Sequence, residues 1–295
     1  MDLIRKIIMD LCKFSPRQGE NEVRTAQYLE NFLTQRKINF TSQYFKTEIP
    51  NVIHAELYLD GQRIPCLGKS FVGGMITSKD QIEFSPYSDY IETITFRPIP
   101  TVAISRTNAK FLEKANHVRG EVVVEKYLFQ SRNILVGDTI NPKKIIFAHY
   151  DGLGGGAVDN AGSVAICLEL LIENPELLSE NLFVFAGNEE LSYDSGDYWG
   201  KGYREFENEY LTLLKSALEI VVVDGVGVSP PVIVSEDRED VFPINHFDEF
   251  SSKITWLSSI QSEVLKCYHC LEDTLDKLNF GHFEETRKML EKMLG

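Results

Sequence analysis

Hydrophobic positions along the chain recur with two different spacings. Residues 2–14 and 20–36 carry apolar side chains at helical spacing and predict two amphipathic helices, and residues 38–49 then look extended. From residue 133 onward, short apolar runs alternate with helical patterns, which favours an α/β sheet with helices on both faces. The apolar runs that predict strands are residues 134–136, 145–148, 182–186, 220–223 and 254–257.

The pattern changes between about residues 50 and 130. Short alternating stretches at residues 52–59, 101–105 and 121–129 are broken by glycine and proline. We therefore predict a β-rich insertion at 50–130, with one short helix near residues 107–115, in a main domain formed by 1–49 and 131–295. The insertion is a suitable place for a lid over a site or for contacts between copies in a homo-oligomer.

Composition narrows the classes of partner. The net charge of −14 disfavours nucleic acid and anionic membranes, which both bind clustered Lys and Arg. Charged residues interrupt the first 14 positions, so they lack the apolar core of a signal peptide, and no segment reaches the roughly 20 apolar residues that span a bilayer. Five cysteines then fit reduced thiols, and we expect a cytoplasmic protein. A lone Cys267-x-x-Cys270 pair is weak evidence for a zinc knuckle or a redox pair, and free thiols are favoured.

Histidine and carboxylate side chains follow several predicted strands. Because open α/β sheets bind ligands beyond the carboxyl ends of their strands, we expect these side chains to converge on one crevice. Each alone has an ordinary explanation, as a hydrogen-bonded pair, a helix-dipole partner or a turn residue. Together, their nitrogen and oxygen ligands suit zinc, with manganese or cobalt as alternatives. The set is His149, Asp151, Asp159, Glu189, Glu190, Asp224 and His269.

Five segments in a fixed order resemble the co-catalytic dizinc aminopeptidases, metallopeptidase family 28, whose relatives include glutamate carboxypeptidase and glutaminyl cyclase. The N-terminal SPRQGENEVRTAQYLENFL is also similar to that family's first helices. The resemblance implies the zinc exopeptidase fold, a three-layer αβα sandwich with a mixed, largely parallel central sheet, and peptide substrates. The matching segments are AHYD (148–151), GAVDNAG (156–162), NEEL (188–191), VVVDGVG (221–227) and YHCLEDTLDKLN (268–279).

The resemblance also implies a ligand set for two zinc ions. His149 and Asp224 would bind one ion. Glu190 and His269 would bind the other, and Asp159 would bridge both. In that family the peptide bond after the bridging aspartate is often cis, which here would be the bond to Asn160.

Two further carboxylates carry implied roles. Asp151 is similar to the carboxylate that fixes the tautomer of the ligand His149. Glu189 matches the family's general base, which takes a proton from a metal-bridging hydroxide or water and passes it to the leaving amine. Neighbouring side chains of an extended chain point in opposite directions, so Glu190 can face the metal while Glu189 faces the substrate.

Several functions remain open on such a site. We expect a zinc-dependent aminopeptidase. A carboxypeptidase or small-peptide hydrolase would need a cationic pocket, for which Lys201, Arg204 and Arg238 are the candidates. A single-zinc glutaminyl cyclase-like acyltransferase does not need the full ligand set, and a non-catalytic scaffold does not need Glu189. Tyr193, Tyr198 and Trp199 are candidates for pocket walls or for ordinary packing aromatics.

Overall fold

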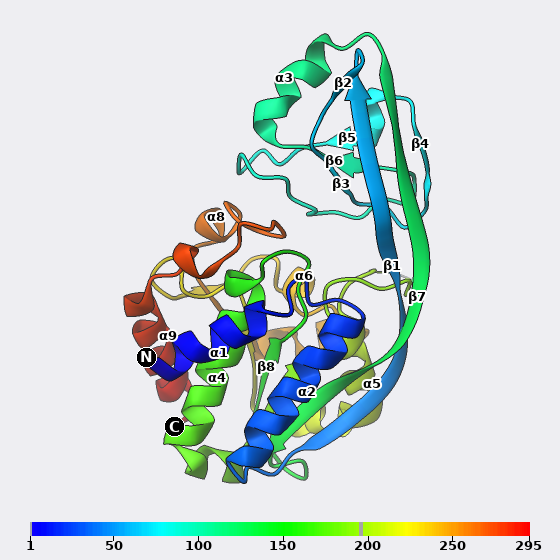
Figure 1. Cartoon of the computed structure of the whole chain (residues 1–295). Helices are drawn as coiled ribbons and strands as arrows, with labels where there is room; N and C mark the ends of the chain where they lie inside the picture. The colour runs from blue at the N-terminus through cyan, green and yellow to red at the C-terminus, as the bar shows by residue number, and fades with distance from the viewer. Residues whose placement is uncertain (1, 195–196) are drawn as a thin grey trace.

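A mixed nine-stranded sheet runs through the protein, and helices cover both faces of the part that forms the body (Figure 1). The computed structural model describes residues 2–194 and 197–295. Within these residues the α-helices are α1 Asp2–Cys12, α2 Glu20–Gln35, α3 Arg106–Lys114, α4 Gly162–Glu173, α5 Lys201–Ser216, α6 Arg238–Val241, α7 Phe247–Phe250, α8 Gln261–Val264 and α9 Phe280–Leu294. The strands are β1 Thr41–Leu59, β2 Gln62–Arg63, β3 Leu67–Gly68, β4 Gly74–Ile76, β5 Ile82–Glu83, β6 Val102–Ala103, β7 Val118–Gly137, β8 Lys144–His149, β9 Asn181–Ala186, β10 Glu219–Val223, β11 Val232–Val234 and β12 Ile254–Ser258.

The central sheet has the strand order β11-β12-β10-β8-β9-β7-β1-β2, with β4 beside β7. Strands β12, β10, β8 and β9 are parallel neighbours, and the remaining strands pair antiparallel. The mixed sheet predicted from the sequence is therefore present, with its parallel part at the centre. β11, Val232–Val234, was not predicted from the sequence.

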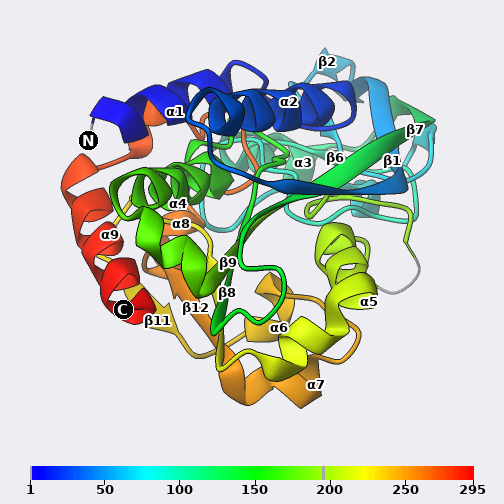
Figure 2. The same ribbon diagram turned by 90° about the horizontal axis from the view of Figure 1, so that it is seen from below.

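Alternate side chains of the central strands enter two separate cores, which gives the three layers αβα. Along β8, Ile146 and Ala148 pack with α1, α2, α4 and α9 on one face, while Ile145 and Phe147 pack with α5 on the other. Figure 2 shows these helices on opposite sides of the strands. The apolar runs of the sequence thus mark strands that are buried on both faces.

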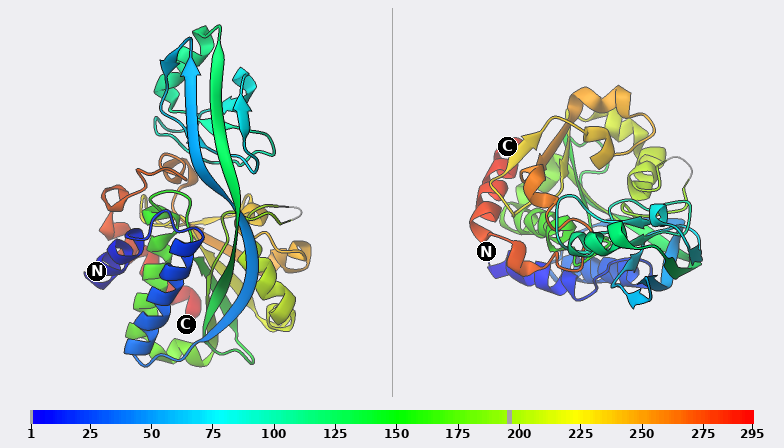
Figure 3. Two further views of the ribbon diagram at one scale, coloured as in Figure 1. Left: turned by 45° about the vertical axis from the view of Figure 1, so that its right-hand side comes forward. Right: turned by 90° about the horizontal axis from the view of Figure 1, so that it is seen from above.

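The insertion stands on two long strands that leave the body together (Figure 3). β1 and β7 pair antiparallel from Thr41↔Leu135 to Leu59↔Val118, and the residues between them build a small core with β4, β6 and α3. The sequence predicted separate short strands here, interrupted at Pro50. A proline is compatible with β1, since among the described strands only β7 pairs with β1 at this point.

The predicted boundaries of the insertion, residues 50 and 130, both fall inside these continuous strands. The division into two domains stays a prediction. The short helix expected near residues 107–115 is α3, Arg106–Lys114. Among the described residues, none of the helices has both the length and the apolar character that a bilayer crossing requires.

Candidate metal centre

The side chains singled out in the sequence come together at one edge of the sheet. His149 is the last residue of β8, and Asp224 directly follows β10. Glu189 and Glu190 lie in the loop after β9. Because these three strands run parallel, their carboxyl ends meet at the same edge. Two further elements complete the site, a π-helical turn (Ala157–Ala161) that carries Asp159 and the loop after α8 that carries His269.

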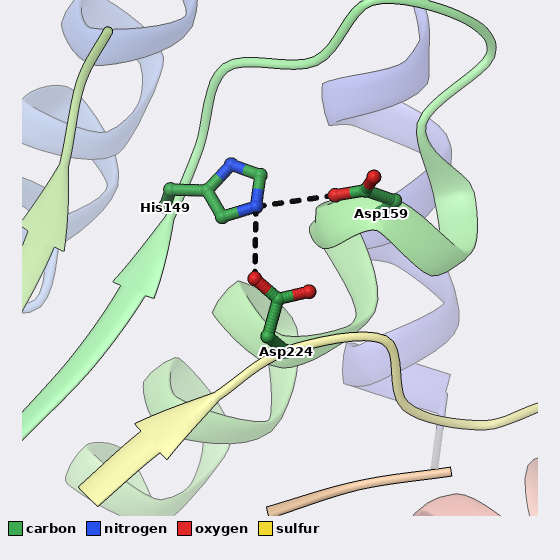
Figure 4. A group of neighbouring side chains, drawn as sticks. All are labelled: His149, Asp159 and Asp224. Atoms are coloured by element: carbon green, nitrogen blue, oxygen red, sulfur yellow. Dashed lines mark ion pairs between the residues drawn. The ribbon is translucent and has the colours of Figure 1, made fainter. Parts of the chain in front are cut away.

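A first group consists of His149, Asp159 and Asp224. Figure 4 shows the imidazole between the two carboxylates, with Nε2 3.1 Å from Asp159 Oδ1 and 3.2 Å from Asp224 Oδ2. The three ligand atoms all lie within 4.8 Å of one another, which is the spacing of side chains that hold a metal ion. His149 is 1% exposed, so the group lies at the bottom of the site.

A second group shares Asp159 with the first. Nε2 of His269 lies 2.6 Å from Glu190 Oε2 and 3.3 Å from Asp159 Oδ2. Despite these distances, His269 Nε2 makes no hydrogen bond within the described chain, and the other Glu190 oxygen, Oε1, has no partner there either. Buried polar atoms that cluster without hydrogen-bond geometry fit a bound cation, because a cation placed between them would satisfy their lone pairs. Asp159 presents one oxygen to each group, as a bridging ligand would.

Asp151 lies behind the first group. Its Oδ1 is 3.3 Å from His149 Nδ1, the ring nitrogen that faces away from the metal-binding atoms. Its Oδ2 accepts hydrogen bonds from the backbone N–H of Glu190 (3.0 Å) and from Gln18 Nε2 (3.3 Å). One carboxylate thus contacts a candidate ligand of each group, His149 at its ring and Glu190 at its backbone.

Glu189 lines the cavity beside the two groups and belongs to neither. It is 7% exposed, and burial raises the pKa of its carboxyl well above the usual value, reinforced by the nearby charges of Glu190 and Asp151 and opposed by His149. A buried carboxyl with a raised pKa that faces a cavity is suited to accept and release a proton.

No protein-family model and no curated protein matches this sequence. Solved structures do match over almost the whole chain. A zinc aminopeptidase from Bacillus subtilis is 15% identical, with a TM-score of 0.69 and coverage of 99% of this chain and 94% of that chain. A peptidase M28 precursor from Shewanella amazonensis is 14% identical, with a TM-score of 0.73 and coverage of 100% and 92%. The chain has the zinc aminopeptidase fold.

Enzymes of a different reaction class share this fold with lower similarity. A glutaminyl cyclase from Porphyromonas gingivalis is 11% identical, with a TM-score of 0.57 and coverage of 99% of this chain and 96% of that chain. These neighbours confirm, at the level of the fold, the resemblance that the five sequence segments indicated. The Asp159–Asn160 peptide bond is cis, as that resemblance implied.

Electrostatics of the site favour positive charge. Burial would lower the pKa of His269, but the carboxylates of Glu190 and Asp159 outweigh burial and raise it to about 10. His149 follows the same pattern, since Asp224 and its other carboxylate neighbours raise the imidazole pKa well above its usual range against the effect of burial. Without metal, the carboxylates therefore hold protons on the imidazoles. Bound cations would take over that role.

The sequence analysis assigned no role to Arg17, although it lies in the N-terminal segment that resembles the family. It is fully buried, and its guanidinium donates to the backbone carbonyls of Tyr150 (2.6 Å), Asp151 (3.0 Å) and Asp159 (3.4 Å). Arg17 therefore ties together the loop after His149 and the turn that carries Asp159. A side chain at Gly156, which has a φ of +71°, would collide with Arg17, which explains part of the glycine-rich link.

Asp273 holds the same turn from the opposite side. Its carboxylate accepts hydrogen bonds from the backbone N–H groups of Val158 (2.8 Å) and Asp159 (3.1 Å). Burial raises the pKa of Asp273 to about 7. Glycine at position 155 allows this approach, because a Cβ there would collide with the Asp273 carbonyl. The signal in the sequence was the run of glycines before Asp159, which marks close backbone approach.

The two candidate metal-binding groups line a cavity of about 480 Å³. Tyr198 and Trp199 line it, as does Trp256, whereas Tyr193 packs against Phe71 of the insertion. Apart from the two candidate ligand histidines, the cavity has no basic side chain among the described residues, and Glu236, Asp237 and Asp240 add acidic groups. The cavity is therefore suited to a ligand that carries positive charge.

Proposed function

We propose that this chain is a dizinc exopeptidase that releases residues from the N-terminus of peptides. The fold places it among metallopeptidase-like structures. The observation that supports the proposal most strongly is the pair of metal-binding groups that share Asp159, with the unliganded carboxyl of Glu189 beside them. His149 and Asp224 would hold one zinc ion, Glu190 and His269 the second; cobalt or manganese fit the same ligands.

The residues of the chain would divide the work. The zinc ions, when bound, would polarise the peptide carbonyl and lower the pKa of water. Glu189 would take a proton from the attacking water and deliver it to the amine that leaves. Asp151, acting through His149 Nδ1, would keep the imidazole in the tautomer whose Nε2 is free to bind metal.

Charge around the cavity supports cleavage from the amino end. A free α-amino group is cationic, and the cavity is lined by carboxylates. The three basic residues considered for a carboxypeptidase pocket all have other partners. Lys201 pairs with Asp194 and Glu205, Arg204 pairs with Asp194, and Arg238 donates to the carbonyls of Ser251 and Ile254.

A metal titration tests the proposal. The chain is stripped with a chelator, zinc is added back, and zinc content and leucine anilide hydrolysis are measured on the same samples. We expect two zinc ions per chain and hydrolysis that appears as they bind. Asp159→Asn should weaken both binding events by at least tenfold. Loss of an outer partner of a metal ligand already lowers affinity about 10–100-fold, and Asp159 would bind both ions directly. Asp224→Asn should weaken only one binding event.

The other outcomes assign other functions. Two zinc ions without anilide hydrolysis would leave the metal site intact and move the search to carboxyl-terminal or acidic peptide substrates. A single zinc ion, together with cyclisation of an N-terminal glutamine, would favour the reaction of the glutaminyl cyclases that share this fold. Intact zinc stoichiometry and affinity in Asp159→Asn would reject the bridging role.

A further inference from the structure

A short segment of the insertion contacts the loop that carries His269. We call residues 92–95, Glu92 to Thr95, the strap. Glu92 forms an antiparallel bridge with Cys270. The next residue, Thr93, donates to the carbonyl of His269 twice, from its backbone N–H (3.1 Å) and from its hydroxyl Oγ1 (3.3 Å). The strap therefore grips the backbone of a candidate metal ligand.

The backbone of His269 needs such support. Its φ is +50°, in the left-handed region that residues other than glycine adopt at some cost. Such a conformation persists where the surroundings fix it. Within the described residues, both hydrogen bonds to the His269 carbonyl come from Thr93, and both residues are buried, at 7% and 6% exposure. The backbone carbonyl of His269 is thus held from outside the body, while its imidazole faces Glu190 and Asp159 of the body.

The strap also forms part of the cavity wall. Ile94 and Thr95 line the same cavity as Glu189 and His269. Contacts next to the strap hold it in this position. The backbone N–H of Phe96 donates to Tyr198 Oη (3.1 Å), and Lys277 Nζ donates to Tyr90 Oη (2.9 Å). Side chains of the insertion therefore lie in the wall of the cavity that holds the two candidate metal-binding groups.

We propose that the strap makes the insertion a working part of the active site. Thr93 is a positioning residue that sets the direction of His269, and Ile94 is a specificity-determining residue that limits the size of the terminal side chain of the substrate. This inference rests on the proposed peptidase function for the role of Ile94. The role of Thr93 concerns metal binding and is measured without substrate.

Three variants at or near the strap test the positioning role by zinc titration. Thr93→Val removes the hydroxyl donor with little change in shape, and Thr93→Ser retains it. Thr107→Val on α3 is the matched control in the same insertion. We expect Thr93→Val to weaken one of the two zinc-binding events by about tenfold, the lower end of the effect of outer partners of metal ligands. Thr93→Ser and Thr107→Val should leave both events unchanged. Equal zinc affinities in wild type and Thr93→Val would overturn the positioning role.

The preference between two anilide substrates tests the proposed role of Ile94. Ile94→Ala should raise the ratio of kcat/KM for phenylalanine anilide over leucine anilide by about tenfold, because a few methyl groups in an apolar pocket discriminate on this scale. Ile99→Ala, an exposed isoleucine of the same insertion that does not line the cavity, should leave the ratio unchanged. An unchanged ratio in Ile94→Ala would overturn the proposal that Ile94 limits the size of the substrate side chain.

The two proposals fail in different ways. A wild-type chain that binds two zinc ions but hydrolyses neither anilide contradicts the aminopeptidase function and the role of Ile94, while the zinc affinity of Thr93→Val still decides the positioning role. If the wild type hydrolyses the anilides, but Thr93→Val keeps its zinc affinities and Ile94→Ala keeps its substrate ratio, only the proposed roles of the strap are contradicted. A chain that binds no zinc overturns both proposals.

Discussion

The loops of the body and the strap of the insertion meet at one cavity, but they are held by different kinds of contact. The body fixes its loops with buried charged groups, Arg17 and Asp273, that bind backbone atoms around Asp159. The insertion reaches the site through a single bridge, two hydrogen bonds from Thr93 and partly exposed contacts such as Lys277 with Tyr90. The turn that carries Asp159 is thus held by buried charged groups, whereas the strap holds the backbone of His269 and part of the cavity wall by neutral hydrogen bonds and weaker contacts.

The largest effect is expected where the body carries the proton transfer. Glu189→Gln should lower kcat for anilide hydrolysis by roughly 10²–10⁴-fold, the usual contribution of a general base. Zinc stoichiometry should stay at the wild-type value, because Glu189 belongs to neither metal-binding group. Glu176→Gln, at an exposed glutamate of the turn Pro175–Ser179 that does not line the cavity, is the control. Near-normal activity of Glu189→Gln would show that the proton acceptor lies elsewhere.

The second effect tests the buried hydrogen bonds of Arg17 in the body. Arg17→Met should lower the free energy of unfolding by about 3 kcal/mol, since buried carbonyls that lose a charged donor each cost about 1–3 kcal/mol. Zinc affinity should fall as well, because the loop after His149 and the turn with Asp159 lose their common partner. Urea unfolding and zinc titration measure both changes.

Arg24→Met is the matched control for Arg17→Met. Arg24 is 55% exposed at its side chain and pairs with Glu20 on the surface of α2, so its loss should change stability by less than about 1 kcal/mol. If Arg17→Met destabilised the chain without any change in zinc affinity, Arg17 would support the fold and not the site.

The third effect concerns pH and the metal-free body. The pKa of His269 is raised to about 10 by Glu190 and Asp159 against the effect of burial, whereas an unfolded histidine titrates at about 6.5. This histidine therefore stabilises the folded state below pH 6.5, and that stabilisation is lost as the pH rises towards 10. We expect the urea midpoint of the zinc-stripped chain to fall between pH 7 and pH 9. In the zinc-loaded chain the imidazole is neutral, and this part of the decline should vanish. A stripped chain that gains stability over the same range would contradict the assignment.

The body was also the region that the sequence described well. Apolar runs such as residues 145–148 are long enough to mark buried parallel strands, and the carboxyl ends of parallel strands lie together by geometry. That is why His149, Glu190 and Asp224 could be placed at one edge from their order alone. Their metal-binding roles still rest on the resemblance and await the titration.

The insertion could not be described in the same way. Its strands are held by pairing between distant segments, and Pro50 and the polar run at residues 130–133 hide the continuity of β1 and β7. Residues 131–133 of this run are buried because their side chains find partners, as when Asn133 donates to Gln43 and to the Gly202 carbonyl. Thr93 has no motif around it, and its importance depends on a contact across 176 residues of sequence.

The smallest effect is expected at the partly exposed contact between Tyr90 and Lys277, beside the strap. Tyr90→Phe removes the hydrogen bond from Lys277 but keeps the ring that the ammonium faces at 5.0 Å. Because the pair lies at a partly exposed edge, the unfolding free energy should change by less than about 1 kcal/mol, and zinc affinity should not change at all. Lys277→Met, which removes both contacts, provides the comparison. If either variant weakened zinc binding as much as Thr93→Val does, the insertion would be positioned at the site by its exposed edge, and the hydrogen bonds of Thr93 would be a consequence of that docking.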